Sequence, residues 1–215
     1  MSTSSQIDYI APQNCQKCKR LAAFIQEQKQ AHPHWHNGSV PSFGPIDAQI
    51  LVLGLAPGLK GANATGRPFT GDYAGKVLYQ ALSKFGYCEG AYQAHAQDGI
   101  KLVNLRISNA VRCVPPQNKP TPSEISNCRD YLTQELQQMT QLKVIFTLGR
   151  IAHDTCLTHF KLRKSDYPFA HNSAYRLPDG VMLVSSYHCS RYNIQTNRLS
   201  IEMFDDVVSR LSGFC

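Results

Sequence analysis

The chain has 215 residues, a formal net charge of +7 at pH 7, a pI near 9.0 and eight cysteines. This length fits one α/β domain with a substantial core. No apolar run approaches membrane-spanning length and the first residues lack a signal-peptide pattern, so we expect a cytoplasmic protein of bacterial or archaeal intracellular type, without a membrane partner. The charge favours a polyanionic partner such as nucleic acid, although many basic proteins bind none.

The N-terminal part is predicted to be a lead-in, residues 1–14, followed by one domain, residues 15–215. Asn14 is a residue type favoured at N-caps, and apolar residues recur after it at helical spacing. We therefore expect Cys15 and Cys18 to lie in the first turn of a helix. The next tract, His-Pro-His-Trp-His, resembles a metal-binding sequence, but it lacks a neighbouring carboxylate or cysteine, so we interpret it as a solvated loop.

Residues 50–72 combine a strand and a glycine-rich loop. The apolar run at 50–53 is too short for a helix and predicts a buried strand. A helical pattern follows at 77–85. In α/β folds this order places a ligand at the carboxyl end of a parallel strand, whereas the loop alone is equally consistent with a turn that binds nothing. Backbone can approach a ligand closely at the glycines, which are Gly54, Gly58, Gly61, Gly66 and Gly71.

The second half of the chain alternates strands and helices. Residues 100–113 form an extended segment with two possible strand registers, and the prolines after it exclude regular structure. Thr121-Pro-Ser-Glu124 is a capping box that begins a helix. Buried strands are predicted at 143–149 and 181–187, each followed by a helical pattern. The alternation indicates parallel strands, right-handed crossovers and helices on both faces of a four-stranded sheet.

Four of the cysteines form a candidate metal centre. Cys15 and Cys18 are separated by two residues, Cys113 ends an extended segment, and Cys128 follows across the proline loop. Four thiolates from two segments suit a Cys₄ zinc site or a [4Fe–4S] cluster, and four unrelated buried thiols are the alternative. The others are interpreted as structural or incidental: Cys88, Cys156, Cys189 and Cys215.

Two polar residues lie where strands are predicted to end. His188 follows the strand at 181–187, at the edge that also carries the glycine loop, where it can donate to a developing anion. Asn109 lies near the end of the extended segment, and a carboxamide can read the hydrogen-bonding edge of a base. A structural histidine and a turn asparagine are the alternatives.

Three segments together resemble the iron–sulfur uracil-DNA glycosylases: GLAPGLKGANATGRPFTGD, SNAVRCVPPQNKPTPSEISNC and SYHCSRYNIQTNRLS. The resemblance is closest to family 5 (type 5), because Gly-Leu-Ala-Pro has no acidic residue at position 55 or 56. It implies a single-domain three-layer α/β/α sandwich around a four-stranded, mainly parallel sheet. It also implies a base pocket and a [4Fe–4S] cluster held by Cys15, Cys18, Cys113 and Cys128.

The resemblance assigns roles within the base pocket. Phe69 would stack on a flipped base, Asn109 would hydrogen-bond its edge, and His188 would stabilise the departing base anion. The backbone at Gly54, Leu55 and Ala56 would contact the base and leave room for the attacking water. No carboxylate occurs at 55 or 56, so we expect Asn63 to position that water, ahead of Asp72 as a less favoured substitute.

The sequence departs from the family pattern twice. Cys189 stands where the family usually has proline, which removes a φ restraint and places a thiol beside the site. Asn197 stands where glycine is often found, and asparagine tolerates the left-handed conformation nearly as well.

The expected activity is that of a DNA repair glycosylase that flips uracil, and other deaminated or modified bases such as hypoxanthine or ethenocytosine, out of DNA and hydrolyses the N-glycosidic bond. The expected partner is damaged DNA and the expected state a monomer. Tyr192 would wedge into the base stack or pack on its own loop. Candidate phosphate contacts, otherwise ordinary solvated charges, are Lys60, Arg67, Lys76, Arg191 and Arg198.

Two alternatives remain. A non-catalytic damaged-DNA-binding module would keep the pocket and lack activity. The observation that favours it is Cys189, which replaces the proline usual in the family. A nucleotide-binding enzyme would use the glycine loop for phosphate, but the loop lacks both the P-loop ending and the G-x-G-x-x-G order.

Overall fold

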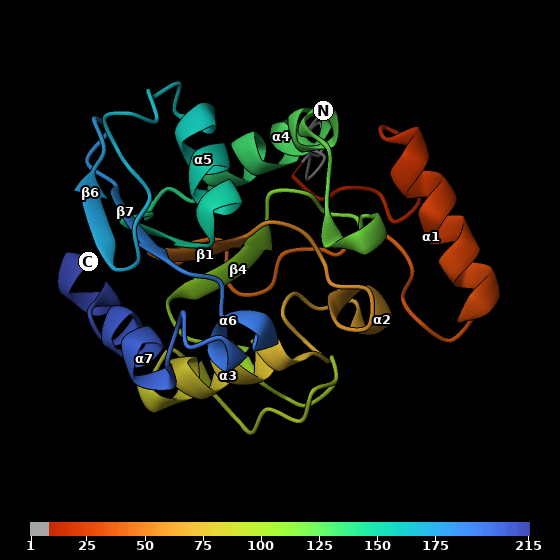
Figure 1. Ribbon diagram of the computed structural model, residues 1–215, viewed down its shortest axis with the longest axis horizontal. Helices are drawn as coiled ribbons and strands as arrows, with labels where there is room; N and C mark the ends of the chain where they lie inside the picture. The colour runs from red at the N-terminus through yellow and green to blue at the C-terminus, as the bar shows by residue number, and fades with distance from the viewer. Residues whose placement is uncertain (1–8) are drawn as a thin grey trace, which may run out of the picture.

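A computed structural model describes residues 9–215; residues 1–8, the start of the predicted lead-in, lie outside the described residues. A five-stranded sheet in the order β4-β1-β5-β7-β6 forms the centre of the molecule (Figure 1). Its first four strands are parallel and β6 is antiparallel to β7. The strands are β1 (Ile50–Gly54), β4 (Leu105–Asn109), β5 (Val144–Leu148), β6 (Ser173–Arg176) and β7 (Met182–Ser186).

The predicted α/β class is confirmed, but the predicted count of four strands is wrong by one. β1, β4, β5 and β7 are the predicted strands, and β6 was missed. Its residues Ser173–Arg176 alternate between half-buried and exposed positions, as an edge strand does, and so present no continuous apolar run.

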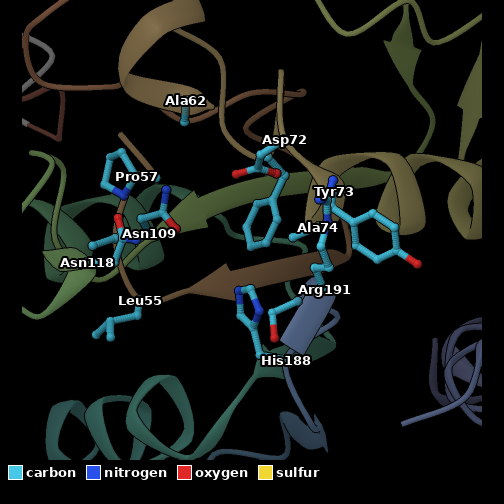
Figure 2. Close-up of a pocket in the computed structure, with 14 residues that line it drawn as sticks. Leu55, Pro57, Ala62, Asp72, Tyr73, Ala74, Asn109, Asn118, His188 and Arg191 are labelled. Atoms are coloured by element: carbon cyan, nitrogen blue, oxygen red, sulfur yellow. The ribbon is translucent and has the colours of Figure 1, made fainter. Parts of the chain in front are cut away.

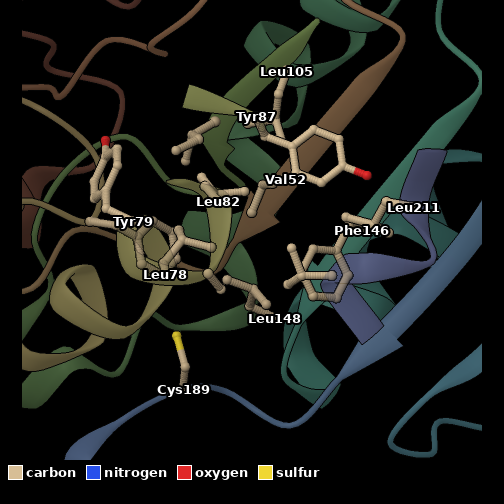
Figure 3. Packing of buried hydrophobic residues seen from close by; sticks show 14 of the residues in the cluster. Val52, Leu78, Tyr79, Leu82, Tyr87, Leu105, Phe146, Leu148, Cys189 and Leu211 are labelled. Atoms are coloured by element: carbon tan, nitrogen blue, oxygen red, sulfur yellow. The ribbon is translucent and has the colours of Figure 1, made fainter. Parts of the chain in front are cut away.

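Helices cover both faces of the sheet (Figure 1). α4 (Pro122–Gln138) and α5 (Arg150–His159) lie on one face, and α3 (Tyr73–Lys84) and α7 (Ile201–Ser209) lie on the other. Each layer has its own apolar core. On the α3 side, Leu78, Leu82, Phe146 and Leu148 pack together (Figure 3). On the α4 side the core contains Leu53, Leu132, Ile145 and Leu157. A short 3-10 helix near the C-terminus, η2 (Leu211–Phe214), packs against the core on the α3 side.

The other elements of the described chain are α1 (Lys19–Ala31), α2 (Ala62–Thr65), β2 (Cys88–Glu89), β3 (Lys101–Leu102), η1 (Pro116–Asn118) and α6 (Arg191–Gln195). α1 begins later than predicted, with Cys18 as its N-cap and Cys15 in the preceding turn. The capping box at Thr121 is present as predicted. Asn197 has the expected left-handed conformation, with φ of +56°. No described helix is long and apolar enough to cross a membrane.

Three strand ends meet at one edge of the sheet. Gly54, the last residue of β1, is paired with Asn109, the last residue of β4. β7 ends at Ser186, two residues before His188. The described part of the lead-in packs on the loop before the sheet, because the Ser39 hydroxyl donates to the carbonyls of Ala11 and Pro12. The domain boundary at residue 15 stays a prediction.

Candidate functional site

A cavity of about 380 Å³ opens at this edge (Figure 2). It brings together five of the predicted base-pocket residues: Leu55, Ala56, Phe69, Asn109 and His188. Asp72, Tyr73, Asn118 and Arg191 also line it. Figure 2 shows Asp72 and His188 on opposite sides. The volume lies at the lower end of the range for small-ligand sites, which suits a ligand the size of one base.

Gly54 lies beneath two of these side chains. A methyl group at this position would lie 2.4 Å from Oδ1 of Asn109 and 2.8 Å from two ring atoms of Phe69. Glycine is therefore what allows the carboxamide and the aromatic ring to converge over the end of β1. Asn109 Oδ1 is buried and has no hydrogen-bond partner in the described chain. Leaving such an acceptor unpaired costs about 1–3 kcal/mol, and an N–H of a bound ligand would satisfy it.

Phe69 is held in an unusual backbone conformation, with φ of +50°. The Tyr79 hydroxyl donates to the carbonyl of Pro68 at 3.1 Å, and the Tyr92 hydroxyl donates to the carbonyl of Phe69 at 3.5 Å. The two tyrosine rings stack on each other with centroids 4.7 Å apart. Strain of this kind persists only where surrounding contacts impose it, and it concentrates at functional sites.

His188 faces Phe69 across the cavity, with ring centroids 6.0 Å apart and an angle of 28° between the rings. Its carbonyl accepts a hydrogen bond from Asn193 Nδ2 at 2.8 Å, whereas no hydrogen bond joins its ring to another described residue. Burial lowers the pKa of His188, although Asp72 opposes the shift. The ring is therefore neutral at pH 7 and keeps an N–H for a ligand. Next to it, the buried Cys189 thiol donates to the Ala74 carbonyl at 3.5 Å.

Asp72 and Asn118 are cavity residues that the sequence ranked low or missed. Asp72 is the N-cap of α3, and its Oδ1 accepts a hydrogen bond from the Gly75 N–H at 2.9 Å. Asn118 has φ of +56° in the proline loop between Cys113 and Cys128. The prolines excluded regular structure there, but no sequence signal showed that this loop turns towards the cavity.

Asn63, which we expect to position the water, lies away from the cavity wall, and its role stays a prediction. Asn63 lies in α2, is fully buried, and does not line the cavity. Its Nδ2 donates to Oδ1 of Asn37 at 3.0 Å, because the short helix turns this side chain inward. The less favoured Asp72 occupies the cavity wall instead.

One predicted phosphate contact is wrong. The Arg67 side chain is only 5 % exposed and forms an ion pair with Asp98 at 2.6 Å. Its guanidinium also lies 5.0 Å from the ring centre of Phe43 and 5.2 Å from that of Tyr79, so Arg67 stabilises the loop rather than facing solvent. The other candidates are exposed: Lys60, Lys76, Arg191 and Arg198. Tyr192 is 71 % exposed on α6.

A second cavity is lined by all four cysteines predicted to bind the cluster: Cys15, Cys18, Cys113 and Cys128. None of the eight cysteines forms a disulfide. Burial, followed by the proximity of the other three cysteines, raises the pKa of Cys113 to about 12. Thiols that raise one another's pKa in this way are stabilised as thiolates by a bound cation. No set of three or more His, Cys, Asp or Glu residues among positions 9–215 is arranged to hold a single metal ion.

Hydrogen bonds and an ion pair support this second cavity. The Arg112 N–H donates to Cys128 Sγ at 3.3 Å, and Asn127 Nδ2 donates to Cys18 Sγ at 3.7 Å. Arg20 of α1 forms a two-point contact with Glu124 of α4, at 2.8 and 2.6 Å. The helices that flank the thiols are thus joined independently of any bound group. Four cysteines that line one cavity are the donor set of either a Cys₄ zinc site or a [4Fe–4S] cluster.

The fold and the first cavity define a three-layer α/β/α protein with a base-sized cavity at the carboxyl edge of its sheet. The sequence matches the uracil DNA glycosylase superfamily over residues 41–212. The type-5 uracil-DNA glycosylase of Thermus thermophilus is 44% identical over 208 residues, covering 93% of this chain and 94% of that protein. The type-5 enzyme of Pyrobaculum aerophilum is 34% identical over 205 residues, covering 93% and 88%. The type-4 enzyme of Archaeoglobus fulgidus is 31% identical over 153 residues, covering 69% of each. This chain belongs to the uracil DNA glycosylase superfamily and, within it, to the type-5 uracil-DNA glycosylases.

Proposed function

We propose that this protein is a DNA repair glycosylase that removes uracil, and related deaminated bases, from DNA and leaves an abasic site. The family membership and the names of its relatives support this activity. The observation that carries it is the buried, unpaired Oδ1 of Asn109 beside Phe69 and His188 in a base-sized cavity.

Asn109 supplies a physical reason for selecting deaminated bases. Deamination of cytosine or adenine converts a ring nitrogen that accepts a hydrogen bond into an N–H that donates one. Oδ1 of Asn109 accepts from that N–H, so uracil and hypoxanthine satisfy an atom that the parent ring nitrogens leave unpaired. Phe69 provides the aromatic face on which the extruded base stacks.

His188 stabilises the leaving group. Cleavage of the N-glycosidic bond transfers the bonding electron pair to the base, which departs as an anion while the sugar becomes cationic. The neutral imidazole donates its free N–H to the developing anion in a site shielded from water. One donor of this kind contributes about 3–4 kcal/mol of transition-state stabilisation.

We assign the hydrolytic step to Asp72 and Asn118, and their position in the cavity lining supports this assignment. The negative charge of the Asp72 carboxylate stabilises the cationic sugar. The carboxylate also accepts a proton from the attacking water as the C–O bond forms. The Asn118 carboxamide orients that water without deprotonating it. We assign these roles to the two residues in place of Asn63.

Cys15, Cys18, Cys113 and Cys128 would hold a [4Fe–4S] cluster. When bound, the cluster cross-links distant segments of chain and takes no part in the hydrolysis. The chain between Cys113 and Cys128 carries Asn118, so the thiolates anchor both ends of a loop that reaches the first cavity. Tyr192 fills the gap in the base stack, which its exposure allows.

Release of uracil from a uracil-containing duplex under single-turnover conditions tests the function. We expect abasic sites to form with the wild-type protein and to form far more slowly with His188→Ala. A protein that binds the duplex but releases no base is instead the non-catalytic binding module, which the family membership does not favour. The cytoplasmic location and the monomeric state stay predictions of the sequence.

A further inference from the structure

A larger groove of about 920 Å³ adjoins the base cavity. It runs between α3 and residues 90–94, and three residues form walls of both hollows: Asp72, Tyr73 and Arg191. The groove therefore begins where the cavity ends. An extruded nucleotide remains covalently joined to its strand, so the strand must leave the cavity across one of its borders.

The groove carries positive charge that the described protein does not neutralise. Lys76 is exposed on α3, Arg191 is exposed at the start of α6, and neither forms an ion pair within residues 9–215. The single carboxylate among the groove residues is Asp72, at the junction with the cavity. Free cations along a channel attract the phosphates of a nucleic-acid backbone.

Aromatic and amide side chains accompany these cations. The Arg191 guanidinium lies 5.3 Å from the ring centre of Tyr73, which holds it at the border between the two hollows. Gln80 and Gln93 are exposed along the groove and offer both donors and acceptors. Cations interleaved with aromatic faces are typical of channels that follow a single strand of nucleic acid.

We propose that this groove binds the stretch of DNA strand directly adjoining the flipped nucleotide, with Lys76 and Arg191 contacting its phosphates. The proposal rests on the proposed glycosylase function and adds to it a strand path on one side of the damaged base. Because a phosphate contact positions the strand without reading its sequence, the groove contributes affinity and orientation rather than base choice.

Gapped substrates test the proposal with the full-length protein. Three duplexes are compared. In one, the uracil-containing strand is intact on both sides of the uracil; in the second its 5′ part is missing, and in the third its 3′ part is missing. The value of kcat/KM for uracil release is measured on each. We expect the wild type to lose efficiency most when one particular side is missing. Lys76→Gln should lower kcat/KM about fivefold on the two substrates that retain this side. On the substrate that lacks it, kcat/KM should be the same for Lys76→Gln and the wild type.

Lys101→Gln is the control, since it removes the same charge from an exposed lysine that lies outside the groove and forms no ion pair within residues 9–215. Lys76→Gln should also make the salt dependence of DNA binding shallower by about 0.9 in the log–log slope. Equal effects of Lys76→Gln on all three substrates, or none on any, overturn the proposal. Failure of the wild type to release uracil from every substrate would instead overturn the glycosylase function itself.

Discussion

The backbone of Gly75 packs directly against the carbonyl of Phe69: a methyl group at position 75 would lie 1.9 Å from that carbonyl oxygen. Helix α3 therefore contacts the loop that presents the aromatic ring with no side chain between them. Phe69 has φ of +50°, a conformation that bulky residues rarely adopt. The close approach at Gly75 and the tyrosine hydrogen bonds together maintain it.

Gly75→Ala should displace Phe69 and slow base release about 100-fold, because a shift near 1 Å in a positioning residue has an effect of this size. The added methyl group meets backbone, which cannot move aside as a flexible side chain can. Gly213→Ala is the control, since a methyl group at position 213 meets nothing within 4 Å. Single-turnover rates of the two variants test whether Gly75 is needed to position Phe69, and thermal unfolding verifies that both variants are folded. Equal rates would show that Gly75 is not needed to place the ring.

His188→Ala should lower the single-turnover rate about 100- to 1,000-fold with little change in stability. The pH dependence of the wild type is a sharper test. Burial lowers the pKa of His188 from its ordinary value of 6.5, so the neutral ring is present above this pH and is lost as pH falls through the lowered pKa. We expect the imidazole-dependent rate to stay level from pH 6.5 to 8. A rate that falls as pH rises through 6.5 would mean that the imidazolium is the active form.

Asp72→Asn and Asn63→Ala separate the two candidates for handling the water. Asparagine caps a helix as well as aspartate, so Asp72→Asn should keep the fold and lower the rate about 10- to 100-fold. Asn63→Ala removes the hydrogen bond to Asn37 and should reduce the free energy of unfolding by about 1 kcal/mol while preserving the rate. The opposite pattern, a slow Asn63→Ala and an unaffected Asp72→Asn, would support the prediction from sequence.

Cys113→Ser should abolish iron binding and lower thermal stability, because Cys113 contributes to the cavity lined by the four thiols. Anaerobically purified wild type should be brown, with absorbance near ~400 nm and iron and sulfide in cluster stoichiometry. Cys156→Ser provides the control, since Cys156 is buried in the α4-side core away from this cavity. Stoichiometric zinc without iron in the wild type would reject the cluster.

Stability should fall at acid pH through two buried ion pairs. Burial opposes ionisation of Glu135, but Arg112 and Arg106 hold its pKa down to about 2. Burial likewise opposes ionisation of Asp98, but hydrogen bonds, first from Arg67, lower its pKa to about 2. Both folded-state values lie below those of the unfolded chain, so this stabilisation is complete above the unfolded pKa and is lost as pH falls towards 2.

Denaturant unfolding between pH 7 and pH 2 measures this loss. Glu135→Gln leaves Arg106 and Arg112 without their carboxylate and should destabilise the protein by about 3–5 kcal/mol at pH 7. Its unfolding free energy should then change less with pH than that of the wild type. Glu27→Gln, an exposed change on α1, should behave as the wild type does. An unchanged acid profile in Glu135→Gln would assign the loss to other groups.

The positions of most elements could be predicted because they depend on local patterns. The apolar runs of β1, β5 and β7 and the capping box of α4 are visible within a few residues. Edge strand β6 was not predictable in this way, since half of its side chains face solvent. The start of α1 was misjudged because an asparagine resembles an N-cap wherever it precedes a helical pattern.

The residues of the site likewise fall into two groups, those that the sequence indicated and those that only the tertiary structure revealed. Residue type and position at predicted strand ends indicated Asn109 and His188, and the family resemblance of the local motifs added Phe69. Only the tertiary structure showed that Arg67 is paired with Asp98, that Asn63 turns inward to Asn37, and that Asp72 and Asn118 reach the cavity. The direction of a side chain in a loop depends on contacts with segments far away in the chain, and no local pattern encodes those contacts.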